Sequence, residues 1–196
     1  MVSADKIDLK QKKAQIRGRM KELRKSVPDE LVKNRSHMIC ERLTSSSYYK
    51  AADIILIYNA INKEVELNEL MAAAASDGKL IAYPVCTDKI HMEAYVPNSD
   101  SSFIKGAYGI SEPDTQDSVI IDPERIDLVI APCTAFDKEL RRLGMGAGYY
   151  DRYLKRCVNA KIVAAAFEFQ KVEEVPSGEF DIKMDAVVTE SDVFRK

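Results

Sequence analysis

Short apolar runs rich in Val and Ile alternate along this chain with segments of helical periodicity. A run such as 127–132, which is apolar at almost every position, is typical of a strand buried on both faces of a parallel sheet. The alternation therefore predicts an α/β fold with a mainly parallel open sheet, a Rossmann-like three-layer sandwich with helices on both faces. The expected strands are 53–60, 80–86, 91–97, 127–132, 161–167 and 184–190, and the expected helices are 9–25, 28–44, 66–76 and 149–157.

The chain of 196 residues has the length of one domain, and no repeat, low-complexity tract or linker divides it. Its 46% hydrophobic and 31% charged residues are typical of a globular protein and exclude a mostly disordered chain. We therefore expect a single domain over residues 1–196. Residues 98–126 are polar and turn-rich, with Pro113 and Pro123 as breakers, and we expect loops there.

The sequence favours a cytoplasmic protein. No apolar run approaches the roughly 20 residues that a membrane helix needs. The first residues lack the apolar core of a secretory signal, and Asp5 and Asp8 argue against an acid-poor mitochondrial presequence. The four cysteines are far apart and the chain has two histidines, so we expect buried reduced thiols rather than a zinc site. No heptad pattern or large apolar stripe demands a partner, and we expect a monomer that binds no membrane.

The charges are unevenly distributed. Residues 1–50 contain 13 Lys and Arg against 6 Asp and Glu, whereas residues 51–196 contain 16 against 25. Nucleic-acid-binding domains usually carry their basic excess throughout, so we expect no nucleic-acid partner. A small polyanionic ligand that contacts the basic helix at 9–25 fits better, although a solvated basic face is the simpler alternative.

A glycine cluster lies where open α/β sheets bind their ligands, between the buried strand 127–132 and the helix expected at 149–157. Glycines let the backbone approach phosphate oxygens, and the free N–H groups at a helix start favour anions. The spacing matches neither GxxxxGK[ST] nor GxGxxG, because Tyr149 stands where the last glycine would be. The cluster therefore predicts a phosphate or nucleotide site of another kind, the alternative being a flexible turn with solvated arginines. Its residues are Gly144, Gly146 and Gly148, flanked by Arg141, Arg142 and Arg152.

The run from Pro132 to Leu154 resembles the signature of the 5-formyltetrahydrofolate cyclo-ligase family, which is approximately PGxxFDxxGxRLGxGxGYYDRxL. In this sequence Cys133 and Leu140 replace two glycines of that pattern. We expect both replacements to alter the backbone of the loop, since Leu in particular avoids positive φ. Other landmarks agree in order and spacing over nearly the whole chain: Lys13, Arg17, Tyr58, Glu64, Val65, Pro84, Gly109, Ile110, Glu112, Pro113, Met184, Asp185, Val188 and Thr189.

The resemblance implies that the protein closes 5-formyltetrahydrofolate to 5,10-methenyltetrahydrofolate while MgATP is converted to ADP and phosphate. The formyl oxygen takes the γ-phosphoryl group, N10 attacks the activated carbon, and phosphate leaves. Such catalysis depends mainly on positioning and on stabilisation of charge at the phosphoryl group. Two alternatives remain open: a non-catalytic homologue that binds folate and ATP, and an ATP-using ligase that acts on another small substrate.

The resemblance also implies roles for individual residues. Glu64 and Arg142 would be catalytic, and Asp151 and Asp185 would hold magnesium through oxygen ligands. The simpler alternatives are a surface glutamate, an Asp151 that caps or pairs with Arg152, and a turn residue at Asp185. ATP would contact Lys13, Ala14, Gln15, Ile16 and Arg17, and also Arg142, Leu143, Gly144, Met145, Gly146, Ala147, Gly148, Tyr149 and Tyr150. The folate would contact Asn59, Glu64, Met145, Gly146, Ala147, Gly148 and Tyr149.

Overall fold

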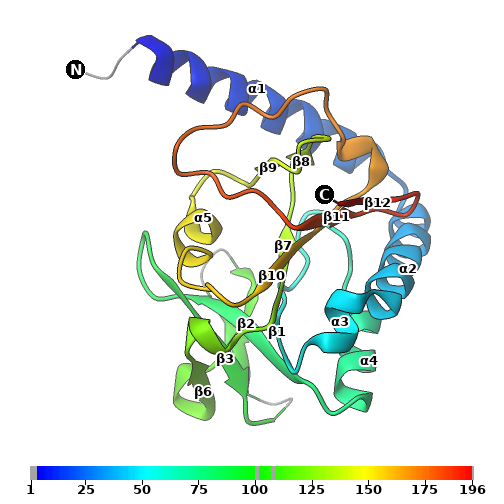
Figure 1. The fold of residues 1–196 in the computed structure, drawn as a ribbon, viewed down its shortest axis with the longest axis vertical. Coiled ribbons are helices and arrows are strands. Elements are labelled where there is room, and N and C mark those ends of the chain that lie inside the picture. The colour runs from blue at the N-terminus through cyan, green and yellow to red at the C-terminus, as the bar shows by residue number, and fades with distance from the viewer. Residues whose placement is uncertain (1–3, 100–101, 107–108, 196) are drawn as a thin grey trace.

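The computed structural model describes residues 4–99, 102–106 and 109–195, and its centre is an eight-stranded sheet (Figure 1). The strand order is β12-β11-β10-β7-β1-β2-β3-β6. The five strands from β11 to β2 are parallel, whereas β12, β3 and β6 pair antiparallel with their neighbours. The bounds are β1 (Ile54–Leu56), β2 (Leu80–Cys86), β3 (Met92–Pro97), β6 (Ser118–Ile121), β7 (Leu128–Pro132), β10 (Lys161–Ala165), β11 (Ala186–Val188) and β12 (Val193–Arg195).

Three helices cover one face of this sheet: α2 (Asp29–Ser45), α3 (Ser47–Ala51) and α4 (Asn68–Ser76). They lie together on the right of the sheet in Figure 1. Successive strand residues point to opposite faces. Ile55 accordingly packs in the same cluster as Ile39 of α2, while its neighbours Ile54 and Leu56 belong to the cluster on the other face.

The opposite face has one short helix, α5 (Tyr149–Tyr153), on the left in Figure 1. Coil segments and the hairpin of β8 (Ala135–Phe136) and β9 (Arg142–Leu143) complete this layer. The predicted fold class, a mainly parallel α/β sheet with helices on both faces, is confirmed, but this second layer is thinner than expected. The helix predicted at 149–157 ends early because the backbone bonds after it become tight i to i−3 turns, as from Cys157 to Leu154.

The segment 98–126, predicted to be loops, contains three strands among its described residues. β6 pairs with β3 at the edge of the main sheet. β4 (Phe103–Lys105) and β5 (Ser111–Pro113) form a separate hairpin. These strands have only three or four residues, and neither a continuous apolar run nor a clear apolar alternation marks them, so the sequence did not predict them.

The helix α1 (Ala4–Ser26) crosses above the carboxyl ends of the central strands (Figure 1). Of its described side chains only Met20 and Arg24 are buried. No helix in the described ranges of the chain is both long enough and apolar enough to span a membrane.

The order of the strands reverses between β1 and β7, which are neighbours in the sheet. From β1 the chain continues to β2 on one side, and from β7 it continues to β10 on the other. Open α/β sheets bind ligands at the carboxyl ends of the strands at such a reversal. The segments that leave these two strands, 57–67 and 133–148, should therefore border a site.

Candidate active site

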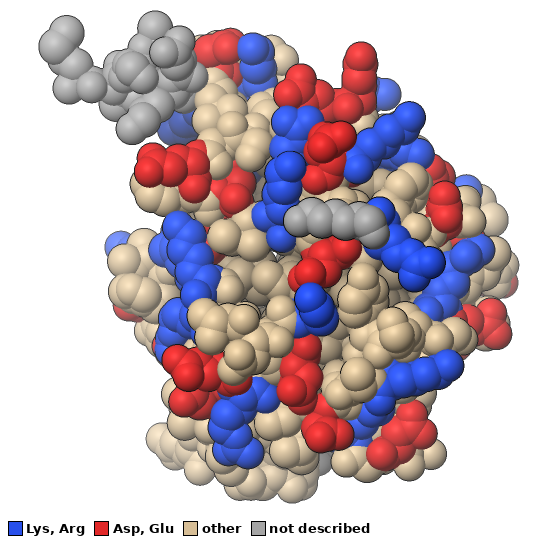
Figure 2. Space-filling model, viewed as in Figure 1, with Lys and Arg blue, Asp and Glu red and all other residues tan. Residues whose placement is uncertain are grey.

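A cavity of about 1410 Å³ opens at this reversal. On the molecular face drawn in Figure 2, Lys and Arg are interspersed with Asp and Glu rather than gathered by sign. The cavity combines the basic helix, the segment after β1 and the glycine loop after β7. Its lining residues lie within 9–17, 59–64, 84–92, 110–112, 132–134, 142–155 and 178–181.

The glycine loop closes against helix α1. Arg17 donates through Nε to the carbonyl oxygen of Gly144 at 2.8 Å. Gly146 has φ 121° and Gly148 has φ 73°, conformations that L-residues with side chains rarely adopt. A Cβ atom at position 146 would lie 3.4 Å from the guanidinium carbon of Arg17. The two glycines therefore allow the backbone both to turn and to approach this cation.

Helix periodicity divides the predicted segment 13–17. Lys13 and Arg17 lie one turn apart and both line the cavity, where Lys13 donates to Asp181 at 2.5 Å. Ala14 and Gln15 are exposed and are absent from the lining, and Ile16 packs in a small cluster around Met20. The structure thus places two of these five residues where they could contact a ligand in the cavity.

Arg142 is the buried cation of the site, and its side chain is 2% exposed. Its guanidinium donates to the carbonyl oxygen of Pro132 and to Oδ1 of Asp151, each at 3.0 Å, and lies 5.6 Å from the ring centre of Tyr150. Its Nε atom has no hydrogen-bond partner within the described residues. Arg142 therefore joins the end of β7 to helix α5 and leaves one donor unused.

The two tyrosines of the glycine loop are placed differently. The Tyr149 hydroxyl donates to the carbonyl oxygen of Asp88, which ties the loop to the turn between β2 and β3. The hydroxyl of Tyr150 is buried, and burial raises the pKa of Tyr150 far above its ordinary value. Both residues line the cavity, and Tyr150 stays neutral at any physiological pH.

Glu64 lies at the other side of the cavity, is 4% exposed, and follows a strained turn. Asn62 and Lys63 have φ angles of 49° and 57°, so two successive residues are left-handed just before it. Glu64 accepts through Oε2 from the Ile61 N–H at 3.2 Å. Burial raises the pKa of Glu64 above its ordinary value, while the Ile61 N–H and Arg24 offset part of that rise.

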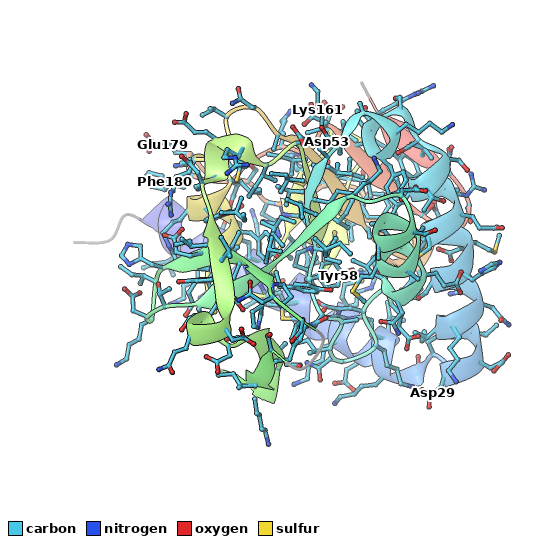
Figure 3. All side chains as sticks on the ribbon, turned by 90° about the horizontal axis from the view of Figure 1, so that it is seen from below. Asp29, Asp53, Tyr58, Lys161, Glu179 and Phe180 are labelled. Atoms are coloured by element: carbon cyan, nitrogen blue, oxygen red, sulfur yellow. The ribbon has the colours of Figure 1, made fainter. Side chains whose placement is uncertain are left out.

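Asn59 is half-buried at the end of β1, where its side-chain amide donates to the carbonyl oxygen of Ser111 at 2.6 Å. Tyr58 beside it lies inside the molecule (Figure 3), and its hydroxyl donates to the carbonyl oxygen of Val65. Asn59 and Glu64 line the same cavity as Met145 to Tyr149. The structure thus brings the predicted folate-contacting residues together.

The two carboxylates expected to share magnesium are not brought together. Asp185 accepts from the Ile162 N–H at 2.8 Å and pairs with Lys161, at the amino ends of the parallel strands. Figure 3 shows this edge, with Asp53 and Lys161 labelled near one another. In register Ile162 lies level with Val129, three residues before Pro132, or about 10 Å along the strand.

Of the two predicted magnesium ligands, only Asp151 lines the cavity. Asp185 fits that role poorly because its carboxylate already accepts a backbone hydrogen bond. No group of three or more His, Cys, Asp and Glu side chains in the described part of the chain is arranged to hold a metal. Magnesium needs only one or two protein carboxylates when phosphates and water supply its remaining ligands. The donor set at Asp151 is therefore compatible with a metal that arrives with a nucleotide.

Leu140 replaces a family glycine without abolishing the turn. It adopts φ 61°, the left-handed conformation expected of the glycine, and donates its N–H to the carbonyl oxygen of Asp137 at 3.0 Å. Its side chain is 3% exposed within the core cluster on the α5 face. The other replacement, Cys133, is buried at the cavity wall. The expectation that Leu140 diverts the loop is therefore wrong, because core packing holds the residue in the conformation that it intrinsically avoids.

Replacing Leu140 by Gly should lower the stability of the protein. Relief of left-handed strain is worth about 1–2 kcal/mol, whereas loss of a buried leucine side chain costs about 2–5 kcal/mol. We expect Leu140→Gly to unfold about 2 kcal/mol more easily in denaturant titrations. The exposed, left-handed Asn62 provides the control, and Asn62→Gly should change the free energy of unfolding by less than about 0.5 kcal/mol. A Leu140→Gly variant as stable as the parent would show that the leucine side chain contributes little to the free energy of unfolding.

Some cavity residues were not predicted as site residues. Ser111 and Glu112 come from the segment expected to be loops, and Phe180 and Asp181 come from the chain before β11. Glu112 is buried at 6% exposure. The landmark from Gly109 to Pro113 was the signal that could have identified Glu112.

Comparisons with known proteins agree with this geometry. The sequence profile of the 5-formyltetrahydrofolate cyclo-ligase family matches residues 9–190. A Schizosaccharomyces pombe protein named "Probable 5-formyltetrahydrofolate cyclo-ligase" is 31% identical over 94% of this chain and 98% of its own. The Escherichia coli K12 5-formyltetrahydrofolate cyclo-ligase is 31% identical over 73% of this chain and 81% of its own.

A solved structure leads to the same family. The NMR structure of Aquifex aeolicus 5,10-methenyltetrahydrofolate synthetase is 32% identical in sequence and superposes with a TM-score of 0.83. The match covers 93% of this chain and 92% of that one. Together with the assembled cavity, these matches show that the chain is an enzyme of the ligase class and belongs to the 5-formyltetrahydrofolate cyclo-ligase family.

Proposed function

We propose that this protein uses ATP and magnesium to cyclise 5-formyltetrahydrofolate to 5,10-methenyltetrahydrofolate, with release of ADP and phosphate. One observation carries the proposal: a single cavity joins three basic residues of α1 (Lys10, Lys13 and Arg17), the glycine loop and the pair Asn59 and Glu64. A cationic part suited to phosphates and a polar part that bears the Glu64 acceptor thus lie in the same cavity. A reaction between a nucleotide and an amide-bearing substrate requires this arrangement.

The nucleotide side of the cavity is supplied by α1 and the glycine loop. Lys13 and Arg17 line the cavity, Arg17 contacts the loop, and Gly146 and Gly148 leave the loop backbone without side chains that would keep a phosphate away. Bound ATP supplies the phosphoryl group that turns the formyl oxygen into a leaving group. Arg142, a buried cation with an unused Nε donor, is our choice for the residue that stabilises negative charge at the phosphoryl group. Asp151, which Arg142 holds, is our choice for the residue that contacts nucleotide-bound magnesium.

The folate side is supplied by Asn59 and Glu64. The Oε1 atom of Glu64 has no hydrogen-bond partner within the described residues, so it is available to a donor of the substrate. It could accept a hydrogen bond from the pterin or take the proton that N10 loses during attack. Because burial raises its pKa, the acid limb of activity should lie above the ordinary glutamate value of 4.5.

The decisive experiment is the appearance of the methenyl-folate absorbance band when purified protein is mixed with 5-formyltetrahydrofolate, ATP and magnesium. We expect the band to grow and the rate to fall to background when ATP or magnesium is omitted. No band, with both ligands still bound in calorimetry, would assign the protein to the non-catalytic alternative. If neither ligand bound, the proposal would be rejected.

We further propose that the protein acts as a cytoplasmic monomer whose partner is the folate and not a nucleic acid or a membrane. The acidic excess of residues 51–196 supports the exclusion of nucleic acid. Light scattering at assay concentration tests the oligomeric state.

A further inference from the structure

Arg24 is a buried cation on α1 that does not line the main cavity. Its Nη1 atom lies 3.5 Å from Oε1 of Glu64, and the two side chains are 7% and 5% exposed. Arg24 instead borders a second, smaller pocket of about 440 Å³ that shares part of its lining with the first, and Lys21 and Lys63 border it too. Arg24 thus contacts Glu64 from outside the lining of the main cavity, while Glu64 is part of that lining.

The two charges depend on one another. In the described residues Nε and Nη1 of Arg24 and Oε1 of Glu64 have no hydrogen-bond partner, and 3.5 Å is a long contact for an ion pair. A buried charge without a partner is strongly unfavourable, so each of these two charges stabilises the other. The long contact also leaves Oε1 able to accept a short hydrogen bond from a ligand.

The Lys63 side chain ties the turn before Glu64 to the segment that follows Arg24. Lys63, the second left-handed residue before Glu64, donates through Nζ to the carbonyl oxygens of Val27 at 2.6 Å and Lys25 at 3.3 Å. It also pairs with Asp29 at 2.9 Å, at the start of α2. The turn that bears Glu64 is therefore fastened to the end of the helix that bears Arg24. A strained turn held in this way is typical of a site that needs accurate placement.

We propose that Arg24 is a positioning residue for the cyclo-ligase reaction, which holds the Glu64 carboxylate in place from outside the main cavity without touching folate or nucleotide. The inference rests on the proposed function for the role of Glu64. It assigns to Arg24 a task that none of the cavity-lining residues of α1 can perform.

Among the described residues, Arg24 is the cation whose charge lowers the pKa of Glu64, although Arg142 lines the same cavity. Tyr58 follows β1, Cys133 follows β7 and Tyr150 belongs to α5, and each interacts electrostatically with Glu64. Burial raises the pKa of Cys133 to about 12 and those of the two tyrosines well above their ordinary values, so all three are neutral. Loss of the Arg24 charge should therefore favour protonated Glu64 directly.

The test compares Arg24→Gln with Arg19→Gln, which removes a charge from an exposed position of the same helix. We expect the acid limb of the pH profile of kcat/KM to move upward by about one pH unit in Arg24→Gln, because an opposite charge at this distance shifts a carboxyl pKa by that order. The rate below the limb then falls about tenfold. The KM for ATP should stay within twofold, and Arg19→Gln should match the parent at every pH.

Three results would overturn the proposal: an unmoved acid limb in folded Arg24→Gln, a raised KM for ATP as its main effect, or an equal loss when Arg24→Gln is added to Glu64→Gln. If Arg24→Gln does not fold, the same pH profile is measured for Arg24→Lys. A retained charge should leave the limb within about half a pH unit of the parent. A rate that falls equally at all pH values in that variant would contradict a role through Glu64.

A second readout separates this inference from the proposed function. Carboxyl-carbon NMR of protein labelled with ¹³C-glutamate, assigned with Glu64→Gln, follows the titration of Glu64 without any substrate. We expect its midpoint to rise in Arg24→Gln and to stay unchanged in Arg19→Gln. An inactive parent protein would reject the cyclo-ligase proposal, whereas equal Glu64 midpoints in the parent and Arg24→Gln would reject the inference about Arg24.

Discussion

Substitution of Glu64 by glutamine should lower kcat for methenyl-folate formation by about 10²-fold or more while the protein stays folded. General base catalysis by a positioned side chain contributes about 10²–10⁴ to a rate, and glutamine keeps the size of the side chain but cannot take a proton. The Ile61 N–H can still donate to the side-chain oxygen that replaces Oε2, so the turn should keep its shape. Initial rates at saturating ATP and folate measure the effect.

Glu69→Gln is the matched control for this substitution. Glu69 is exposed on α4, pairs with His37 and does not line the cavity. The same chemical change there should leave kcat within twofold of the parent. Near-normal turnover by folded Glu64→Gln would remove Glu64 from the mechanism and leave Asn59 as the remaining residue of that segment that we expect to contact folate.

Arg142→Lys should lower kcat by about 10²–10³-fold, the range seen when one donor to a developing oxyanion is removed. The parent guanidinium donates to Pro132 and Asp151 at the same time, in directions that a single ammonium group cannot both reach. One of these two partners then loses its hydrogen bond, and we expect about 1–3 kcal/mol less stability in denaturant titrations. Because lysine keeps the positive charge, the fall in kcat would measure the contribution of the hydrogen-bond geometry of the guanidinium group.

Arg125→Lys provides the control, because Arg125 is exposed at the end of the short helix η3 (Pro123–Arg125) and does not line the cavity. It should leave both rate and stability unchanged. A cycle with Asp151→Asn tests whether Arg142 acts through the carboxylate. If Arg142→Lys had full activity, the two hydrogen bonds by which Arg142 joins Pro132 to Asp151 would have no catalytic role.

The fold could be predicted where residue pattern and burial coincide. The run before Pro132 is apolar throughout, and β7 lies at the centre of the parallel strands with both faces covered. The pattern gave no such signal for β6, whose Val119 and Ile120 are exposed at the sheet edge. The end of α5 was also not predictable, because nothing in 154–157 forbids a helix. Only the turn-type bonds of the folded chain end it at Tyr153.

The sequence predicted which residues form much of the site, but not which side chains contact one another there. Family resemblance identified Glu64, Arg142 and Asp151, and the structure places all three on one cavity. It also singled out Asp185, whose distance from the cavity depends on strand register and cannot be seen in a motif. Arg24 lies in the basic helix expected at 9–25, and no motif singled it out. Its burial depends on a carboxylate 40 positions away in the chain.

The sparse attachment of α1 has a consequence for how ligand affinity should be understood. Only two of its described side chains are buried, and elsewhere it is held by polar contacts such as those of Lys13 and Arg17. Segments with few buried apolar contacts open locally with a free energy well below that of global unfolding. A ligand that bridges this helix and the sheet should therefore suppress such local opening as it binds. Its dissociation constant contains the free energy of suppressing that opening, and a second ligand that finds the helix already fixed binds more tightly without any new contact.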